Sequence, residues 1–206
     1  MGIKSITTLV VLTGLLLLGA AGYFIGGFYG IGADEPHWPV TEELIAEVRD
    51  ASITRASDGV EVPADLGSDE RIRRGAGNYQ AMCAVCHLTP GQQSGELFAG
   101  LYPQPPRFAM QQSINPQRGF WVIKHGIKMT GMPAWGGSNT DDDIWSLVAF
   151  LRAMPGMDEE GYQTLVASSD GHTHGGVATD GHDNSDGHHD IEKSAKDEHF
   201  ADGHTH

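Results

Sequence analysis

Cys83-Ala84-Val85-Cys86-His87 contains both cysteines of this 206-residue chain. On a turn of helix, side chains three positions apart lie on the same face, so the two thiols can react with one flat partner. The imidazole of His87 follows directly and can coordinate a metal held by that partner. The stretch therefore predicts a cofactor site built on one short helical turn.

The C-x-x-C-H spacing is typical of the attachment site of c-type haem, in which two thiols add to the two porphyrin vinyl groups. His87 would then be an axial ligand of the iron. A thioredoxin-like redox pair and half of a zinc site are the alternatives. The redox pair needs a preceding strand and has no use for the histidine, and the zinc site needs two more ligands.

An electron-transfer haem needs a second axial ligand, usually a thioether or a second imidazole. The side chains after His87 that could serve are His125, Met110, Met129, Met132, Met154 and Met157. Met132 lies in the segment 131–136, where glycine and proline favour an extended loop that can lay a side chain across a flat cofactor. Met129 is only three residues away and remains a rival on the residues alone.

Three helices are predicted between residues 68 and 157. Ser68 is a suitable N-cap for a helix that leads into the C-x-x-C-H stretch, and Asn115-Pro116 starts a helix that extends to Ile127. Thr140 and Asp143 have the spacing of a capping box, with an amphipathic helix following them. No convincing alternating strand is present, so we expect an all-α fold whose helices surround one haem.

Residues 68–157 resemble a class I monohaem cytochrome c of the membrane-anchored bacterial type. The resemblance depends on a glycine and an aromatic residue before Cys83, a Met-Pro-Ala-aromatic loop and a closing helix; these are Gly75, Tyr79, Met132 to Trp135, and 141–153 with Trp145, Phe150 and Leu151. It implies a small fold of three to four helices around one covalent haem c, bound at Cys83 and Cys86. It also implies that Met132, not Met129, is the second axial ligand beside His87.

The N-terminal segment predicts a membrane helix. Residues 5–33 are uncharged, which exceeds the roughly 20 residues needed to cross the hydrocarbon core, and we expect a helix over about 6–31. Lys4 before this run and acidic residues after it place the haem domain on the periplasmic side of the inner membrane. A signal peptide cleaved near Ala21 is the alternative. Gly22, Gly26 and Gly30 would share one helix face that a transmembrane partner could approach.

Acidic residues are concentrated outside the predicted haem domain. The chain has 27 Asp and Glu against 13 Lys and Arg, which argues against a nucleic-acid binder. We expect four parts: an anchor over 1–33, an acidic spacer over 34–67, the haem domain over 68–157 and a tail over 158–206. Thr41 could cap a short helix in the spacer.

The tail is expected to be disordered, because it is acidic and has almost no apolar content. It repeats Asp-Gly-His and holds eight of the eleven histidines. Imidazoles among carboxylates suit copper or zinc, so a second possible metal site comprises His172, His174, His182, His188, His189, His204 and His206. A solvated tail without metal is the alternative.

A haem with histidine and methionine ligands leaves no open site for a substrate, which predicts a carrier of single electrons and not an enzyme. It could be a respiratory shuttle or a subunit of an oxidoreductase complex. The cations around the predicted methionine loop could dock acidic patches of redox partners; they are Arg107, Arg118, Lys124 and Lys128. A haem-linked copper- or zinc-handling protein, and a haem enzyme or sensor lacking the methionine ligand, are the alternative functions.

Overall fold

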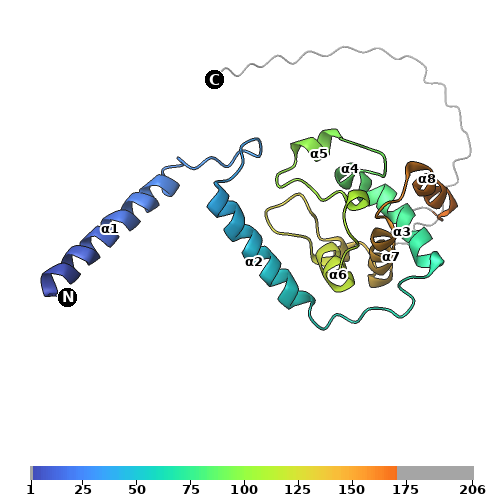
Figure 1. Ribbon diagram of the computed structural model, residues 1–206, viewed down its shortest axis with the longest axis horizontal. Coiled ribbons are helices and arrows are strands. Elements are labelled where there is room, and N and C mark those ends of the chain that lie inside the picture. The colour runs from blue at the N-terminus through green and yellow to red at the C-terminus, as the bar shows by residue number, and fades with distance from the viewer. Residues whose placement is uncertain (1, 171–206) are drawn as a thin grey trace, which may run out of the picture. The chain divides into compact units, whose positions relative to one another are not determined.

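The computed structural model describes residues 2–170 (Figure 1). Within this range every regular element is helical, which confirms the predicted all-α class. The elements are α1 (Ile3–Ile25), α2 (Pro39–Ser57), α3 (Asp69–Met82), α4 (Ala84–His87), α5 (Glu96–Gly100), the 3₁₀ turn η1 (Phe108–Met110), α6 (Pro116–His125), the 3₁₀ turn η2 (Trp135–Gly137), α7 (Asp141–Ala153) and α8 (Glu159–Ser168).

The predicted N-caps of the three domain helices are confirmed. The Ser68 hydroxyl accepts a hydrogen bond from the Arg71 N–H at 3.4 Å, and the Asn115 side chain accepts one from the Arg118 N–H at 3.0 Å. Thr140 and Asp143 form the reciprocal capping box at the start of α7. These bonds satisfy backbone donors that have no partner within the helix, and so they fix where each helix begins.

Helices α3 and α7 cross at close range in the centre of the core. Gly75 makes the approach possible, because a Cβ at this position would overlap the Ser146 carbonyl and lie 2.7 Å from the Phe150 Cβ. The side chains of Ile144, Leu147 and Phe150 on α7 are fully buried. The crossing therefore provides the rigid base on which the rest of the domain is built.

Helix α6 is shorter than the sequence predicts. It ends at His125, because Gly126 follows with a φ of 66° that cannot continue a right-handed helix. Ile127 consequently lies in the loop after the helix and not on it. The early end allows the chain to turn back toward the core before residue 132.

The segment 34–67 is more than a spacer. It contains the 19-residue helix α2, which begins at Pro39, so Thr41 lies within the first turn and is not the N-cap. Arg118 of α6 donates to the Thr54 hydroxyl at 2.6 Å and to the Asp50 carbonyl at 3.2 Å. Ile53 and Ser57 are buried. These contacts attach α2 to the domain, which composition alone did not indicate.

Residues 158–168, predicted as the start of the tail, form helix α8 and its N-cap. Asp158 caps α8, and the side chain of Tyr162 is fully buried beside Tyr79, with ring centroids 6.3 Å apart. The Tyr162 hydroxyl donates to the Gln80 side chain at 2.6 Å. Helix α8 is thus packed on α3 as part of the same helical domain.

Helix α1 is long and apolar enough to cross a membrane, with a mean hydropathy of 2.1. It ends at Ile25, earlier than the predicted residue 31, because Gly26 is its C-cap and Gly27 has a φ of 74°. Gly30 therefore lies outside the helix. The three glycines do not form one helix face, and the predicted small-residue docking surface is wrong in this respect.

Candidate functional site

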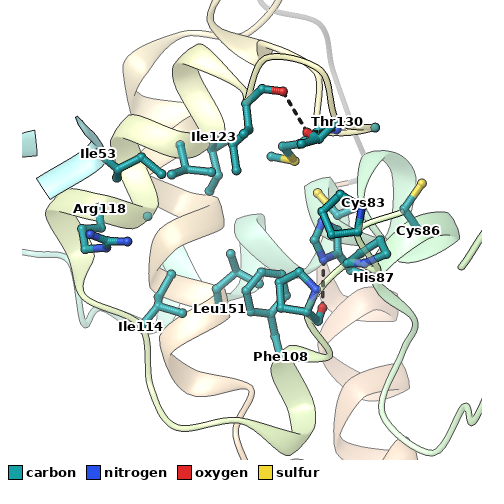
Figure 2. A pocket seen from close by; sticks show the side chains of 18 of the residues that line it. Ile53, Cys83, Cys86, His87, Phe108, Ile114, Arg118, Ile123, Thr130 and Leu151 are labelled. Carbon is teal, nitrogen blue, oxygen red and sulfur yellow. Dashed lines mark hydrogen bonds between the residues drawn. The ribbon is translucent and has the colours of Figure 1, made fainter. Parts of the chain in front are cut away.

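A cavity of about 550 Å³ opens between α3, α6, α7 and the loops that join them. This volume is in the range of cofactor sites, roughly 300–1,000 Å³. Most lining side chains are apolar, including Ile123, Ile127 and Leu151. Figure 2 shows Cys83, Cys86 and His87 on one side of it. The C-x-x-C-H stretch thus faces a partly open, largely apolar cavity.

The attachment turn, residues 83–88, is held by its own backbone and by Tyr79. The Cys83 carbonyl accepts hydrogen bonds from the N–H groups of Cys86 and His87, at 3.1 and 2.8 Å. The buried Tyr79 hydroxyl donates to the Leu88 carbonyl at 2.6 Å. Leu88 has a φ of 63°, a strained conformation for any residue other than glycine. The chain thereby leaves the turn sharply, with both cysteines and His87 facing the cavity.

The His87 ring is fixed by two contacts. Its Nδ1–H donates to the Pro106 carbonyl at 2.9 Å, and its ring stacks on Phe108 with centroids 4.8 Å apart. Burial lowers the pKa of His87, which favours the neutral imidazole. The hydrogen bond assigns the proton to Nδ1 and leaves the lone pair of Nε2 for a metal.

The surroundings of Cys83 do not suit the redox-pair alternative. Burial raises the pKa of its thiol to about 12, and the neighbouring Cys86 adds to the effect. A reactive redox cysteine needs the opposite shift, toward the thiolate. Within residues 2–170, no group of three or more His, Cys, Asp or Glu side chains is placed to hold a metal ion.

Met132 lines the same cavity from the methionine loop, residues 126–136. Its backbone is held on both sides: the N–H donates to the Thr130 hydroxyl at 3.1 Å, and the carbonyl accepts from the Ile127 N–H at 3.2 Å. The Thr130 hydroxyl in turn donates to the Ile127 carbonyl at 2.8 Å. A Cβ on Gly126 would lie 2.8 Å from the Met132 carbonyl oxygen, so only glycine fits there.

The other predicted candidates for the second axial position do not line this cavity. Met129 has a φ of 58° and is fully exposed. Met110 is exposed on η1, and Met154 is fully buried in the core. His125 is exposed and packs its ring on Trp121, at 4.9 Å between centroids. Met157 packs against the core. The structure thus separates Met132 from Met129 by their surroundings.

Two of the four predicted docking cations are paired within the chain. Lys124 forms an ion pair with Asp141 at 2.7 Å, and Arg118 forms one with Asp50 at 3.3 Å. The Arg107 guanidinium lies over the Phe98 ring at 4.7 Å from its centroid. Lys128 is exposed. These four cations therefore present less unpaired positive charge than the sequence suggests.

Helix α2 adds site residues that the sequence analysis missed: Arg49, Asp50 and Ile53 also line the cavity. The sequence signal that could have identified α2 as part of the site was the polar pair Asp50 and Thr54, one helical turn apart. This signal was not sufficient, because their partner Arg118 lies more than 60 residues further along the chain. The predicted metal-binding histidines of the tail, residues 172 to 206, lie outside the described residues.

The donor set of the cavity fits a haem c: two thiols on one turn, an imidazole with its Nε2 free, and a thioether. Residues 70–151 match the model of the family described as cytochrome c oxidase, cbb3-type, subunit III. No curated protein matches the chain. The matched region includes the attachment turn, α6 and the methionine loop, and it leaves α2 and α8 outside.

Proposed function

Residues 70–151 form a class I monohaem c-type cytochrome domain, and from this premise we propose that the chain is a membrane-anchored carrier of single electrons. The domain gives the chain a haem-based electron-transfer function. The proposal adds the anchor, the ligands and the physiological setting.

Cys83 and Cys86 are the proposed thioether attachments, and His87 and Met132 the proposed axial ligands. One observation carries this assignment: these four side chains line a single cavity, whereas Met129 points into solvent. Pro106 holds His87 in the tautomer that presents Nε2. Ile127 and Thr130 hold the Met132 backbone.

A haem c with these ligands supplies one-electron exchange at an iron that has no free coordination position. The chain's part is to keep both axial side chains in place and to exclude water from the space between them. Apolar side chains do this, among them Ile123 of α6, Phe108 of η1 and Leu101, which follows α5. A thioether ligand and an apolar surrounding both favour the ferrous state and so raise the reduction potential.

We place α1 in the inner membrane, with the haem domain on the periplasmic side. Aromatic rings gather at the C-terminal end of α1: Tyr23 stacks near Phe28 and Trp38, with centroids 6.0 Å apart in each pair. Such aromatic residues are typical of the boundary between lipid and water. The anchor over 1–33, the α2 segment over 34–67 and the haem domain are the proposed organisation, with α8 added to the domain.

The matched family is described as a subunit of a cytochrome oxidase, so we propose a respiratory role, either as a shuttle or within an oxidoreductase complex. Acidic patches on redox partners would meet the cations that lack an acidic partner among the described residues, Arg107 and Lys128. Long-range attraction of this kind accelerates association and weakens as salt increases.

The proposal is tested on the full chain purified from membranes. We expect it to resist extraction by alkaline carbonate, to show a low-spin spectrum with a methionine-to-iron band, and not to bind CO when reduced. Binding of CO by the freshly reduced protein would contradict the methionine ligand. Release from membranes by carbonate would contradict the anchor, and it would favour cleavage of the N-terminal segment.

A further inference from the structure

The end of the cavity opposite the attachment turn carries charge. Figure 2 shows Arg118 and Ile53 across the cavity from Cys83 and Cys86, and Arg49 and Asp50 line the same cavity. We call Arg49, Asp50 and Arg118 the charged end. Two of its three members belong to α2, which lies outside the residues matched by the family model.

The charged end is organised around Asp50. Its Oδ1 accepts hydrogen bonds from the Arg49 Nε at 3.1 Å and from an Arg118 NH2 group at 3.3 Å. The Arg49 hydrogen bond is the main cause that lowers the pKa of Asp50, so the carboxylate is ionised at neutral pH. Two guanidinium groups against one carboxylate leave one positive charge beside an apolar cavity.

Donors also remain available there. Within residues 2–170 the two NH2 groups of Arg49 make no hydrogen bond to protein, because the contact of Arg49 with Asp50 uses Nε alone. About a third of each arginine side chain is exposed, at 36% for Arg49 and 36% for Arg118. A guanidinium placed in this way can bind a carboxylate through two parallel hydrogen bonds.

The structure of haem indicates which of its groups would lie near the charged end. The vinyl groups and the two propionates lie on opposite edges of the porphyrin, so thioether bonds at Cys83 and Cys86 direct the propionates away from the attachment turn. We propose that Arg49 and Arg118 bind the haem propionates, which makes α2 a wall of the haem site. This inference rests on the proposed attachment and adds a ligand-binding role for a segment outside the cytochrome domain.

Opposite shifts in reduction potential test this assignment. A cation near the haem stabilises the ferrous form, and an anion stabilises the ferric form, so Arg49→Gln is expected to lower the potential and Asp50→Asn to raise it. We expect each to change the equilibrium constant with a fixed one-electron mediator by roughly three- to tenfold, tenfold being about 59 mV. Arg55→Gln is the matched control, since Arg55 is exposed on the same helix and does not line the cavity.

The pH dependence of the potential gives a second readout. Loss of Arg49 raises the pKa of a paired propionate toward neutrality, so the potential of Arg49→Gln should vary more steeply with pH between about 5 and 8 than that of the parent. Both readouts use the haem-loaded full chain and spectroelectrochemical titration, and neither depends on an activity assay.

Equal potentials for Arg49→Gln and Arg55→Gln, or a lower potential for Asp50→Asn, would overturn the inference. Variants that keep the covalent pigment and the methionine band but show no such shifts contradict only the propionate contact. Loss of covalent pigment from the unmodified chain contradicts the proposed function itself.

Discussion

His87 is fixed by a hydrogen bond from its own ring to Pro106, whereas Met132 is fixed through its main chain, by Ile127 and Thr130. In the attachment turn, the helical spacing of residues 83–87 brings the two thiols and the imidazole together. The methionine loop has no such regularity, and its geometry depends on one glycine and one hydroxyl. A ligand held by the main chain should be easier to displace than one held by its side chain.

The largest effect is expected at the attachment turn. His87→Ala removes the proposed ligand that the covalent bonds place against the iron, so the low-spin spectrum should be lost or the pigment should fail to mature. Absorption and EPR spectra of the purified variant measure this. His125→Ala is the control, since that exposed ring does not line the cavity. A normal low-spin spectrum for His87→Ala would contradict the assignment.

The next largest effect separates the two methionines. Met132→Ala should abolish the methionine-to-iron band, lower the reduction potential and allow the reduced protein to bind CO. Met129→Ala should leave all three properties unchanged, because this side chain is fully exposed. The same band and CO measurements on both variants decide between them, and the reverse pattern would make Met129 the ligand.

A smaller effect tests how the methionine loop is held. Gly126→Ala forces a Cβ to within 2.7 Å of the Pro133 carbonyl carbon, at a φ of 66°, and should cost about 1–3 kcal/mol. Gly156→Ala is matched to it, with a φ of 77° but nothing within 4 Å of the added Cβ. We expect the methionine band of Gly126→Ala to disappear at a lower urea concentration than the helical circular dichroism. If both variants lose the methionine band and the helical signal at the same urea concentration, the methionine loop is not less stable than the rest of the domain.

The smallest effect is expected at the α3–α7 crossing, which supports both the attachment turn and the methionine loop. The Arg71 hydrogen bond lowers the pKa of Asp142 from 3.8, and Arg74 contributes a second ion pair at 2.6 Å. Because the folded-state pKa is lowered, Asp142 stabilises the fold above pH 3.8, and this contribution is lost as pH falls through the folded-state value. Asp142 is half exposed, so the gain at neutral pH should not exceed about 1 kcal/mol.

Urea unfolding of the parent and of Asp142→Asn at several pH values measures this contribution. The variant should be less stable at pH 7 and equal to the parent in strong acid, with the methionine band unaffected at neutral pH. A stability difference that persists at the acid end would assign the effect to packing and not to charge.

The same contrast explains what could be predicted from the sequence. Local features were sufficient for the attachment turn, the caps at Ser68 and Thr140, and α7, because each depends on neighbours within four residues. The choice between Met129 and Met132 was not local, since it depends on where α6 ends and on how Gly126 packs against the returning chain. On the residues alone Met129 remained a rival of Met132, and the family resemblance decided in favour of Met132.

The packing of helices α2 and α8 could not be predicted from the sequence either. Both lie in acidic segments, and their docking depends on single distant partners, Arg118 for α2 and the Tyr79 ring for Tyr162. Composition treats such segments as spacer or tail, because a few buried contacts do not change an average. Arg118 itself was interpreted as a free cation for docking, whereas its contacts with Asp50 and Thr54 explain its position.

The most direct test of the account is covalent attachment. The full chain should be denatured, extracted with acid acetone and digested, and the peptide containing Cys83 and Cys86 weighed by mass spectrometry. We predict that the colour stays with the polypeptide and that this peptide carries the mass of one haem, with neither thiol open to alkylation. Complete extraction of the pigment, together with two alkylated cysteines, would contradict the account.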